Sequence, residues 1–165
     1  METENPANQA DEQSTQQQPL DLARAGQTEA LHALLEKGFN PNFRDEKGQS
    51  LLMLASYNGH YETTKLLLEY GSIVDLRNLR GQTSLGGAAF KGYLDVVQLL
   101  VEHGADVNGD NGYGLTPLAL AKMFAQESVE AYLLSKGGRQ SVGTAMASIP
   151  GQVLKTIRNA RVRQA

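Results

Sequence analysis

Residues 99–108, LLVEHGADVN, run from an apolar helical stretch through a glycine into a polar turn. Its glycine belongs to a series that recurs every 33 residues: Gly38, Gly71, Gly104 and Gly137. Two more glycine series keep this spacing: Gly48, Gly81 and Gly114, then Gly26, Gly59 and Gly92. Two apolar series do so as well: Ala55, Ala88 and Ala121, then Leu67, Leu100 and Leu133. A fixed period of this length predicts an array of stacked supersecondary units.

Each unit is predicted to contain two short helices and a connecting loop. Residues 49–57 form an apolar helical stretch that ends before Gly59, where a residue without a Cβ can close a helix in the left-handed conformation. Residues 62–70 place leucines on one helical face before Gly71. Residues 72–80 mix branched residues with turn formers, which favours an extended excursion with a tight turn.

This pattern resembles the ankyrin repeat, whose motif opens with Thr-Pro-Leu-His-x-Ala. The corresponding segments are SLLMLA at 50–55, TSLGGA at 83–88 and TPLALA at 116–121, so none keeps the histidine. The turn NGH at 58–60 and the stretch 99–108 match the family pattern more closely. We therefore expect weaker hydrogen bonding between repeats but an unchanged fold.

The resemblance implies an all-α solenoid of four stacked helix-turn-helix repeats with inter-repeat β-turn loops. The predicted units are 20–47, 48–80, 81–113 and 114–138, and the first lacks the opening motif, as an amino-terminal cap can. Residues 1–19 are predicted to be a disordered, acidic, Gln-rich leader, and 139–165 a linker with a short basic amphipathic tail. Tetratricopeptide repeats are the alternative, but they lack these glycines and the loop segment.

Composition excludes several kinds of protein. The formal net charge of −3 gives no general attraction to nucleic acid or to an anionic membrane. The absence of cysteine excludes disulfides and thiolate metal sites and fits a reducing compartment, so we expect a cytoplasmic protein. No stretch approaches the length of a membrane span, and no secretory signal is recognised.

The sequence shows no group of residues that resembles a catalytic or metal-binding site. The histidines are His32, His60 and His103, which do not easily converge, and His60 lies where the family has a turn histidine. Asp45, Asp75 and Asp106 fall in inter-repeat loops, where carboxylates commonly accept hydrogen bonds from turn amides. The segment GDNGYG at 109–114 lacks the Gly-Lys-Ser/Thr ending of a phosphate loop. We expect no enzyme, no metal and no cofactor.

The resemblance implies that function depends on the loop tips and the exposed ends of the first helices, which line the concave face of such solenoids. The candidate partner-binding residues there are Arg44, Lys47, Tyr57, Asn58, Arg77, Leu79, Arg80, Phe90, Lys91, Tyr113, Met123 and Phe124. Tyr57, Phe90 and Met123 are 33 residues apart, which predicts one column of large, largely exposed side chains beside a basic band. The alternative is that these aromatic residues pack between adjacent first helices.

The expected function is protein–protein interaction, as an adaptor or inhibitor that binds an acidic partner and is monomeric when free. The alternative is an assembly or regulatory accessory protein acting through the basic tail, in which Val153, Ile157 and Ala160 form an apolar stripe. That tail could cap the last repeat, contact an acidic partner or lie on a membrane surface. Nucleic-acid binding ranks below both, because Glu46 and Asp110 interrupt the basic band. The short chain also resembles the small free-standing ankyrin proteins of bacteria.

Overall fold

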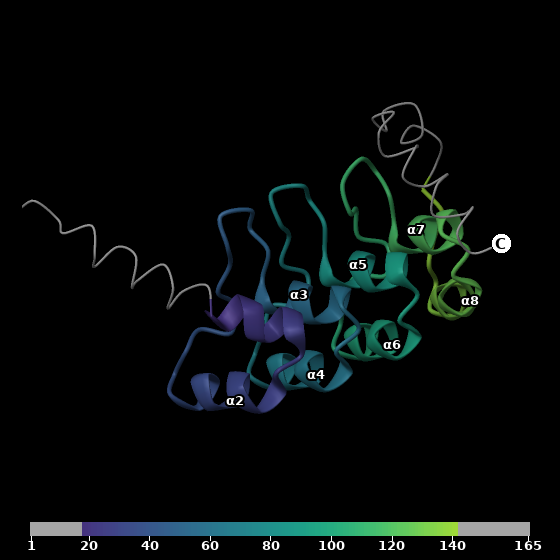
Figure 1. Cartoon of the computed structure of the whole chain (residues 1–165). Helices are drawn as coiled ribbons and strands as arrows, with labels where there is room; N and C mark the ends of the chain where they lie inside the picture. Colours follow the sequence, from purple (N-terminus) through teal and green to yellow (C-terminus); the bar gives the residue numbers. More distant parts are fainter. Residues whose placement is uncertain (1–17, 142–165) are drawn as a thin grey trace, which may run out of the picture.

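A computed structural model describes residues 18–141, and within them the chain forms four antiparallel helix pairs. The pairs are residues 18–25 with α2 (Thr28–Glu36), α3 (Leu51–Tyr57) with α4 (Tyr61–Glu69), α5 (Ser84–Lys91) with α6 (Leu94–Glu102), and α7 (Pro117–Met123) with α8 (Glu127–Ser135). First helices form one row and second helices another, while long loops project from the first row (Figure 1). We call these rows the inner and outer helices. The predicted all-α repeat fold is confirmed, whereas the predicted leader and tail lie almost wholly outside the described residues.

The opening motif acts as a helix start in three repeats. The side chains of Ser50, Thr83 and Thr116 accept hydrogen bonds from the backbone N–H groups three residues later, at 3.1–3.2 Å. Such a cap typically stabilises a helix by about 1 kcal/mol. Because Ser50 is the cap, α3 begins at Leu51 and not at residue 49 as predicted.

Stacked apolar residues form the core. Leu31, Leu67, Leu100 and Leu133 of the outer helices are fully buried, as are Ala55, Ala88 and Ala121 of the inner helices. The alanines leave room for the helices to approach closely, and the leucines fill the space between the two rows. One pair cannot bury these side chains by itself, so each repeat depends on its neighbours. No helix within residues 18–141 is long and apolar enough to cross a membrane.

Hydrogen bonds between repeats come from the loops. One position in each of three consecutive loops, Asn42, Asp75 and Asn108, accepts from a backbone N–H of the next loop, at Ile73, Asp106 and Arg139, over 2.7–3.2 Å. His60 contributes another such contact, because its Nε2 lies 2.9 Å from the carbonyl oxygen of Arg24. Although the motif histidines are missing, other side chains therefore form hydrogen bonds between neighbouring repeats.

One repeat has a buried polar contact that depends on a glycine. Asn111, 6% exposed, accepts hydrogen bonds at Oδ1 from both the backbone N–H and the hydroxyl of Thr83, at 3.1 and 2.6 Å. A Cβ at Gly86 would lie 1.9 Å from that oxygen. Gly86 occupies the place of the motif histidine, and Asn111 fills the space that a larger side chain would take.

Substitution of the two adjacent glycines of α5 should have opposite effects. In the Gly86→Ala variant, displacement of Asn111 breaks buried hydrogen bonds worth about 1–3 kcal/mol, which outweighs the gain of about 1 kcal/mol in helix propensity. Gly87→Ala is the matched control, because its added Cβ meets only the ring edge of Tyr57 at 3.3 Å. Urea unfolding should rank Gly87→Ala above Gly86→Ala by roughly 2 kcal/mol. Equal stabilities would show that Asn111 adapts without loss.

An ion pair replaces apolar contacts at the carboxyl-terminal end of the described array. Ala89 of α5 and Val97 of α6 are fully buried against the following repeat. The equivalent residues of the last pair, 33 positions later, are Lys122 and Glu130, whose charged groups lie 3.4 Å apart with both side chains about one-third exposed. A polar outer face is what a terminal repeat needs to avoid stacking on another molecule.

Replacing the charged residues at the carboxyl-terminal end of the described array with apolar ones should therefore promote self-association. We expect the double variant Lys122→Ala/Glu130→Val to keep its helical circular dichroism, because both residues are partly exposed. Light scattering should then show concentration-dependent dimers that the wild-type chain does not form. A strictly unchanged mass would mean that something else covers this end.

Candidate partner-binding face

Three aromatic rings, at the carboxyl-terminal ends of three successive inner helices, form a continuous stack. The rings of Tyr57 and Phe90 are nearly parallel, with centroids 6.2 Å apart, and Phe124 meets Phe90 edge-on at 4.1 Å. The Nζ of Lys91 lies 5.4 Å from the centre of the Tyr57 ring, a cation–π distance. Tyr57 is 42% exposed, while Phe90 and Phe124 are half-buried. The stack combines packing between repeats with an accessible aromatic edge.

The predicted column is wrong in its third member. Met123 packs beside Leu115 and Ala119 in a small apolar cluster, and the ring of Phe124 continues the stack instead. α7 ends at Met123, so the next residue leaves the helix and its ring can fold back onto Phe90. The side-chain amide of Asn58, another candidate, donates a hydrogen bond to the carbonyl oxygen of Leu54 at 2.7 Å. Asn58 therefore stabilises the end of α3.

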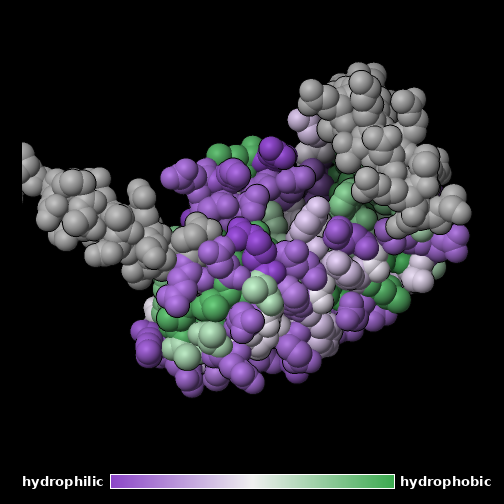
Figure 2. All heavy atoms as spheres, viewed as in Figure 1, coloured by the Kyte–Doolittle hydropathy of each residue, from purple (hydrophilic) through white to green (hydrophobic). Residues whose placement is uncertain are grey.

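The remaining candidates lie on the projecting loops, where apolar side chains stand out from a polar surface. Leu79 is 80% exposed and Tyr113 is 56% exposed, and Arg44, Lys47, Arg77 and Arg80 are exposed as well. Figure 2 shows hydrophobic residues at the outer ends of the loops among mostly hydrophilic ones. The loops brace each other: Leu79 N–H donates to the carbonyl of Lys47 at 3.0 Å, and the Arg77 guanidinium donates to the carbonyl of Asp110.

Tyr113 is held in a strained backbone conformation. Its φ of 59° is in the left-handed region, between Gly112 at 86° and Gly114 at 71°. For a residue with a large side chain this conformation costs about 1–2 kcal/mol. Gly112 cannot be replaced by a larger residue to relieve the turn, because a Cβ there would lie 2.5 Å from the carbonyl oxygen of Arg80. An exposed ring recovers little of this cost through packing.

The structure thus separates the candidates into two groups. The helix-end group contains Tyr57, Phe90, Lys91 and Phe124, and the loop group contains Arg44, Lys47, Arg77, Leu79, Arg80 and Tyr113. An isolated antiparallel bridge joins Arg44 to Ser50, the residue that caps the start of α3, whereas Tyr57 is the last residue of that helix. Seven helical residues at 1.5 Å each separate the two ends of α3 by about 10 Å. We call the surface made up of these two groups the concave face, as the family resemblance implies.

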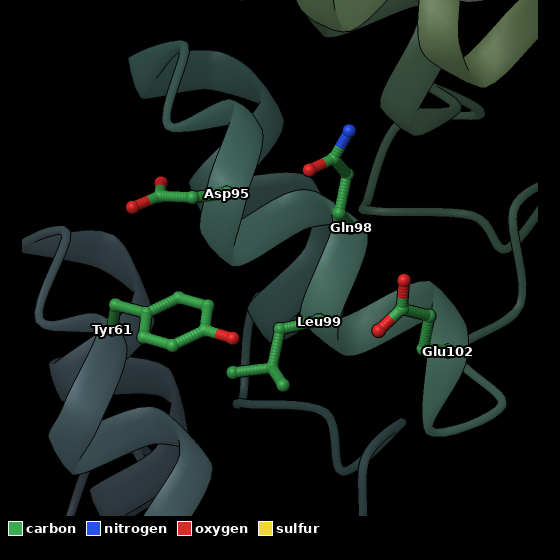
Figure 3. Close-up of a pocket in the computed structure, with 5 residues that line it drawn as sticks. All are labelled: Tyr61, Asp95, Gln98, Leu99 and Glu102. Atoms are coloured by element: carbon green, nitrogen blue, oxygen red, sulfur yellow. The ribbon is translucent and has the colours of Figure 1, made fainter.

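A shallow hollow lies on the opposite side of the molecule, between α4 and α6. It has a volume of about 320 Å³ and is lined by Tyr61, Asp95, Gln98, Leu99 and Glu102 (Figure 3). Burial and the nearby carboxylate of Glu102 raise the pKa of Tyr132 on α8. Sequence reasoning missed this acidic side, although two series at steps of 33, Glu29–Glu62–Asp95 and Glu36–Glu69–Glu102, were available as a signal.

The carboxylates and histidines of the described residues are spread over the solenoid. Within residues 18–141, no three His, Cys, Asp or Glu side chains gather as a metal site would require. The loop carboxylates serve turns: Asp45 accepts from the backbone N–H groups of Lys47 and Gln49 at 2.9 and 2.8 Å. His60 likewise contacts a backbone carbonyl of the preceding repeat.

Comparison with known proteins agrees with this architecture. The family model for ankyrin repeats (3 copies) matches residues 20–111 and 74–144. The chain belongs to the ankyrin-repeat family. Among curated proteins, ankyrin repeat protein PA3287 of Pseudomonas aeruginosa is 54% identical over 48 residues, which cover 29% of this chain and 28% of that protein. Ankyrin repeats are generally protein–protein interaction modules, which is the class of function expected from the sequence.

Substitution of Tyr113 tests whether its backbone strain is real. Asparagine tolerates the left-handed region better than tyrosine, so Tyr113→Asn should leave the chain as stable as the wild type or raise its stability by about 1 kcal/mol. Chemical denaturation measures the difference, with Tyr113→Phe, which keeps both ring and strain, as control. A clear loss of stability in the asparagine variant would mean that the ring makes stabilising contacts.

Proposed function

We propose that this ankyrin-repeat protein binds an acidic segment of a partner protein on its concave face, as an adaptor or inhibitor in the cytoplasm. The observation that carries the proposal is the pair of exposed apolar residues, Leu79 and the strained Tyr113, held next to exposed arginines. Tyrosine and arginine are over-represented among residues that dominate interface energies. Interactions of carboxylates with arginine are strengthened by paired, charge-assisted hydrogen bonds.

The braced loops support this role physically. Hydrogen bonds between neighbouring loops reduce the freedom that a partner must remove, so less of the binding free energy is lost to ordering. The aromatic stack provides a second anchor at the other end of the inner helices. A partner that contacts both groups would span the inner helices, with acidic residues over the loops and an apolar residue near Tyr57.

A charge reversal on each face provides a matched test. Arg80→Glu places a carboxylate at the loop tips, and Lys65→Glu makes the same change on exposed α4, where Lys65 forms only a weak ion pair with Glu69 at 4.0 Å. Affinity capture from extract should retain a protein on the wild type and on Lys65→Glu, with at least tenfold less on Arg80→Glu. Circular dichroism and urea unfolding check that all three chains are folded.

A second variant pair separates the concave face from the carboxyl-terminal tail. Tyr113→Asn on the loops and removal of residues 153–165 are compared in the same capture. Loss with Tyr113→Asn alone supports the proposal, whereas loss only on removal of the tail favours the accessory role of its basic segment. Retention by Arg80→Glu and Tyr113→Asn alike would overturn the concave-face proposal.

A further inference from the structure

Charge is distributed unequally between the two sides of the described solenoid. The outer helices contain eight carboxylates, Glu29, Glu36, Glu62, Glu69, Asp95, Glu102, Glu127 and Glu130, and a single cation, Lys65. The inner helices α5 and α7 contain cations without carboxylates, Lys91 and Lys122. An acidic chain segment is therefore repelled from the outer helices and meets less repulsion on the concave face.

Exposed cations gather on the first two loops of that face. Arg44 and Lys47 lie on the first loop, and Arg77 and Arg80 on the second; we call these four residues the basic band. Asp45, Glu46 and Asp75 lie on the same two loops, so the cations of the band exceed these carboxylates by one. The hydrogen bonds that Asp45 and Asp75 accept from backbone N–H groups hold these carboxylates in place without removing their charge. Glu46 is the exposed acid within the band. The third loop, with Asp106 and Asp110, carries no cation.

The chain itself contains a segment of complementary charge. Residues 1–17 include Glu2, Glu4, Asp11 and Glu12 and no lysine or arginine. This segment joins the described chain at residue 18, the start of the first inner helix, and the basic band lies on the loops that follow the first and second helix pairs. The acidic segment is thus attached at the end of the solenoid that carries the band.

We propose that residues 1–17 dock on the basic band of the same molecule and compete there with the acidic partner. This inference rests on the proposed function only for the competition. Seventeen extended residues reach about 55 Å, and two repeats spaced by about 10 Å are well within that span. Tethering gives the segment a millimolar effective concentration, so a contact with a dissociation constant of about 1 mM is populated within one chain and can still be titrated with separate molecules.

Docking of the leader lowers the apparent affinity for a partner in proportion to the fraction of molecules in which the band is open. If the leader covers the band in two-thirds of the molecules, its removal raises the affinity about threefold. The effect should disappear at high salt, since the screening length is only about 3 Å at 1 M ionic strength. The acidic leader would then act as a weak, built-in competitor that favours partners of higher negative charge.

Spin labelling tests the docking directly, and the absence of native cysteine makes it specific. A nitroxide is attached to the full chain through Asn8→Cys, and broadening of backbone amide signals is measured by NMR. We expect broadening at Lys47 and Arg80 but not at Lys65 or Gln98 on the outer helices. One molar salt should abolish it, as should a neutralised leader with Glu2→Gln, Glu4→Gln, Asp11→Asn and Glu12→Gln. Broadening that survives neutralisation, or that falls on the outer helices or the tail, overturns the inference.

Competition is measured with the leader as its own probe. A fluorescein-labelled peptide of residues 1–17 is titrated against the native full chain and against the full chain with the neutralised leader. The neutralised chain should bind the peptide at least threefold more tightly, and Arg80→Glu in that chain should reduce the binding. Equal affinities for both chains contradict the competition.

The outcomes distinguish this inference from the proposed function. If the spin label shows no docking while Arg80→Glu still abolishes partner retention, only the inference about the leader fails. If the leader docks while Arg80→Glu retains the partner, the concave-face proposal fails and docking stands alone.

Discussion

The fold depends on a steric constraint at the turn between the two helices of each pair. Gly26, Gly59 and Gly92 adopt a left-handed φ of 68–82°. Each is packed against the residue that precedes the outer helix of the following repeat, which is His60, Tyr93 or Gln126 respectively. A Cβ at these glycines would lie only 2.0–2.9 Å from atoms of those side chains. Each glycine therefore both reverses the chain and makes room for the following repeat, so the local turn and the stacking of repeats are one requirement.

Stacking then decides which positions are available for function. The core occupies the sides of the inner and outer helices that face each other, whereas the loops are held by hydrogen bonds to each other and leave their tips exposed. Rigid loops on a packed scaffold are where binding residues can vary without cost to the fold. The strained Tyr113 is an example, because its left-handed backbone lowers the stability of the domain while its exposed ring adds nothing to the core.

The same division separates charge. Carboxylates recur on the outer helices at the 33-residue spacing of the repeats. Cations gather on the loops, which do not take part in helix packing. An overall charge of −3 conceals this difference between the two sides. Because exposed charges act over about 10 Å at moderate salt, each side presents its own field to a partner or to the acidic leader.

The 33-residue period of glycines and leucines is sufficient to predict the repeat architecture, because it encodes local turns and helix faces that need no long-range information. The sequence also identified which loops and helix ends are candidates for binding. Only the tertiary structure decided that Phe124 and not Met123 completes the aromatic stack, that Asn58 closes α3, and that Asn111 fills the place of the motif histidine. These outcomes depend on how side chains of different repeats share one space, and periodicity cannot resolve that competition.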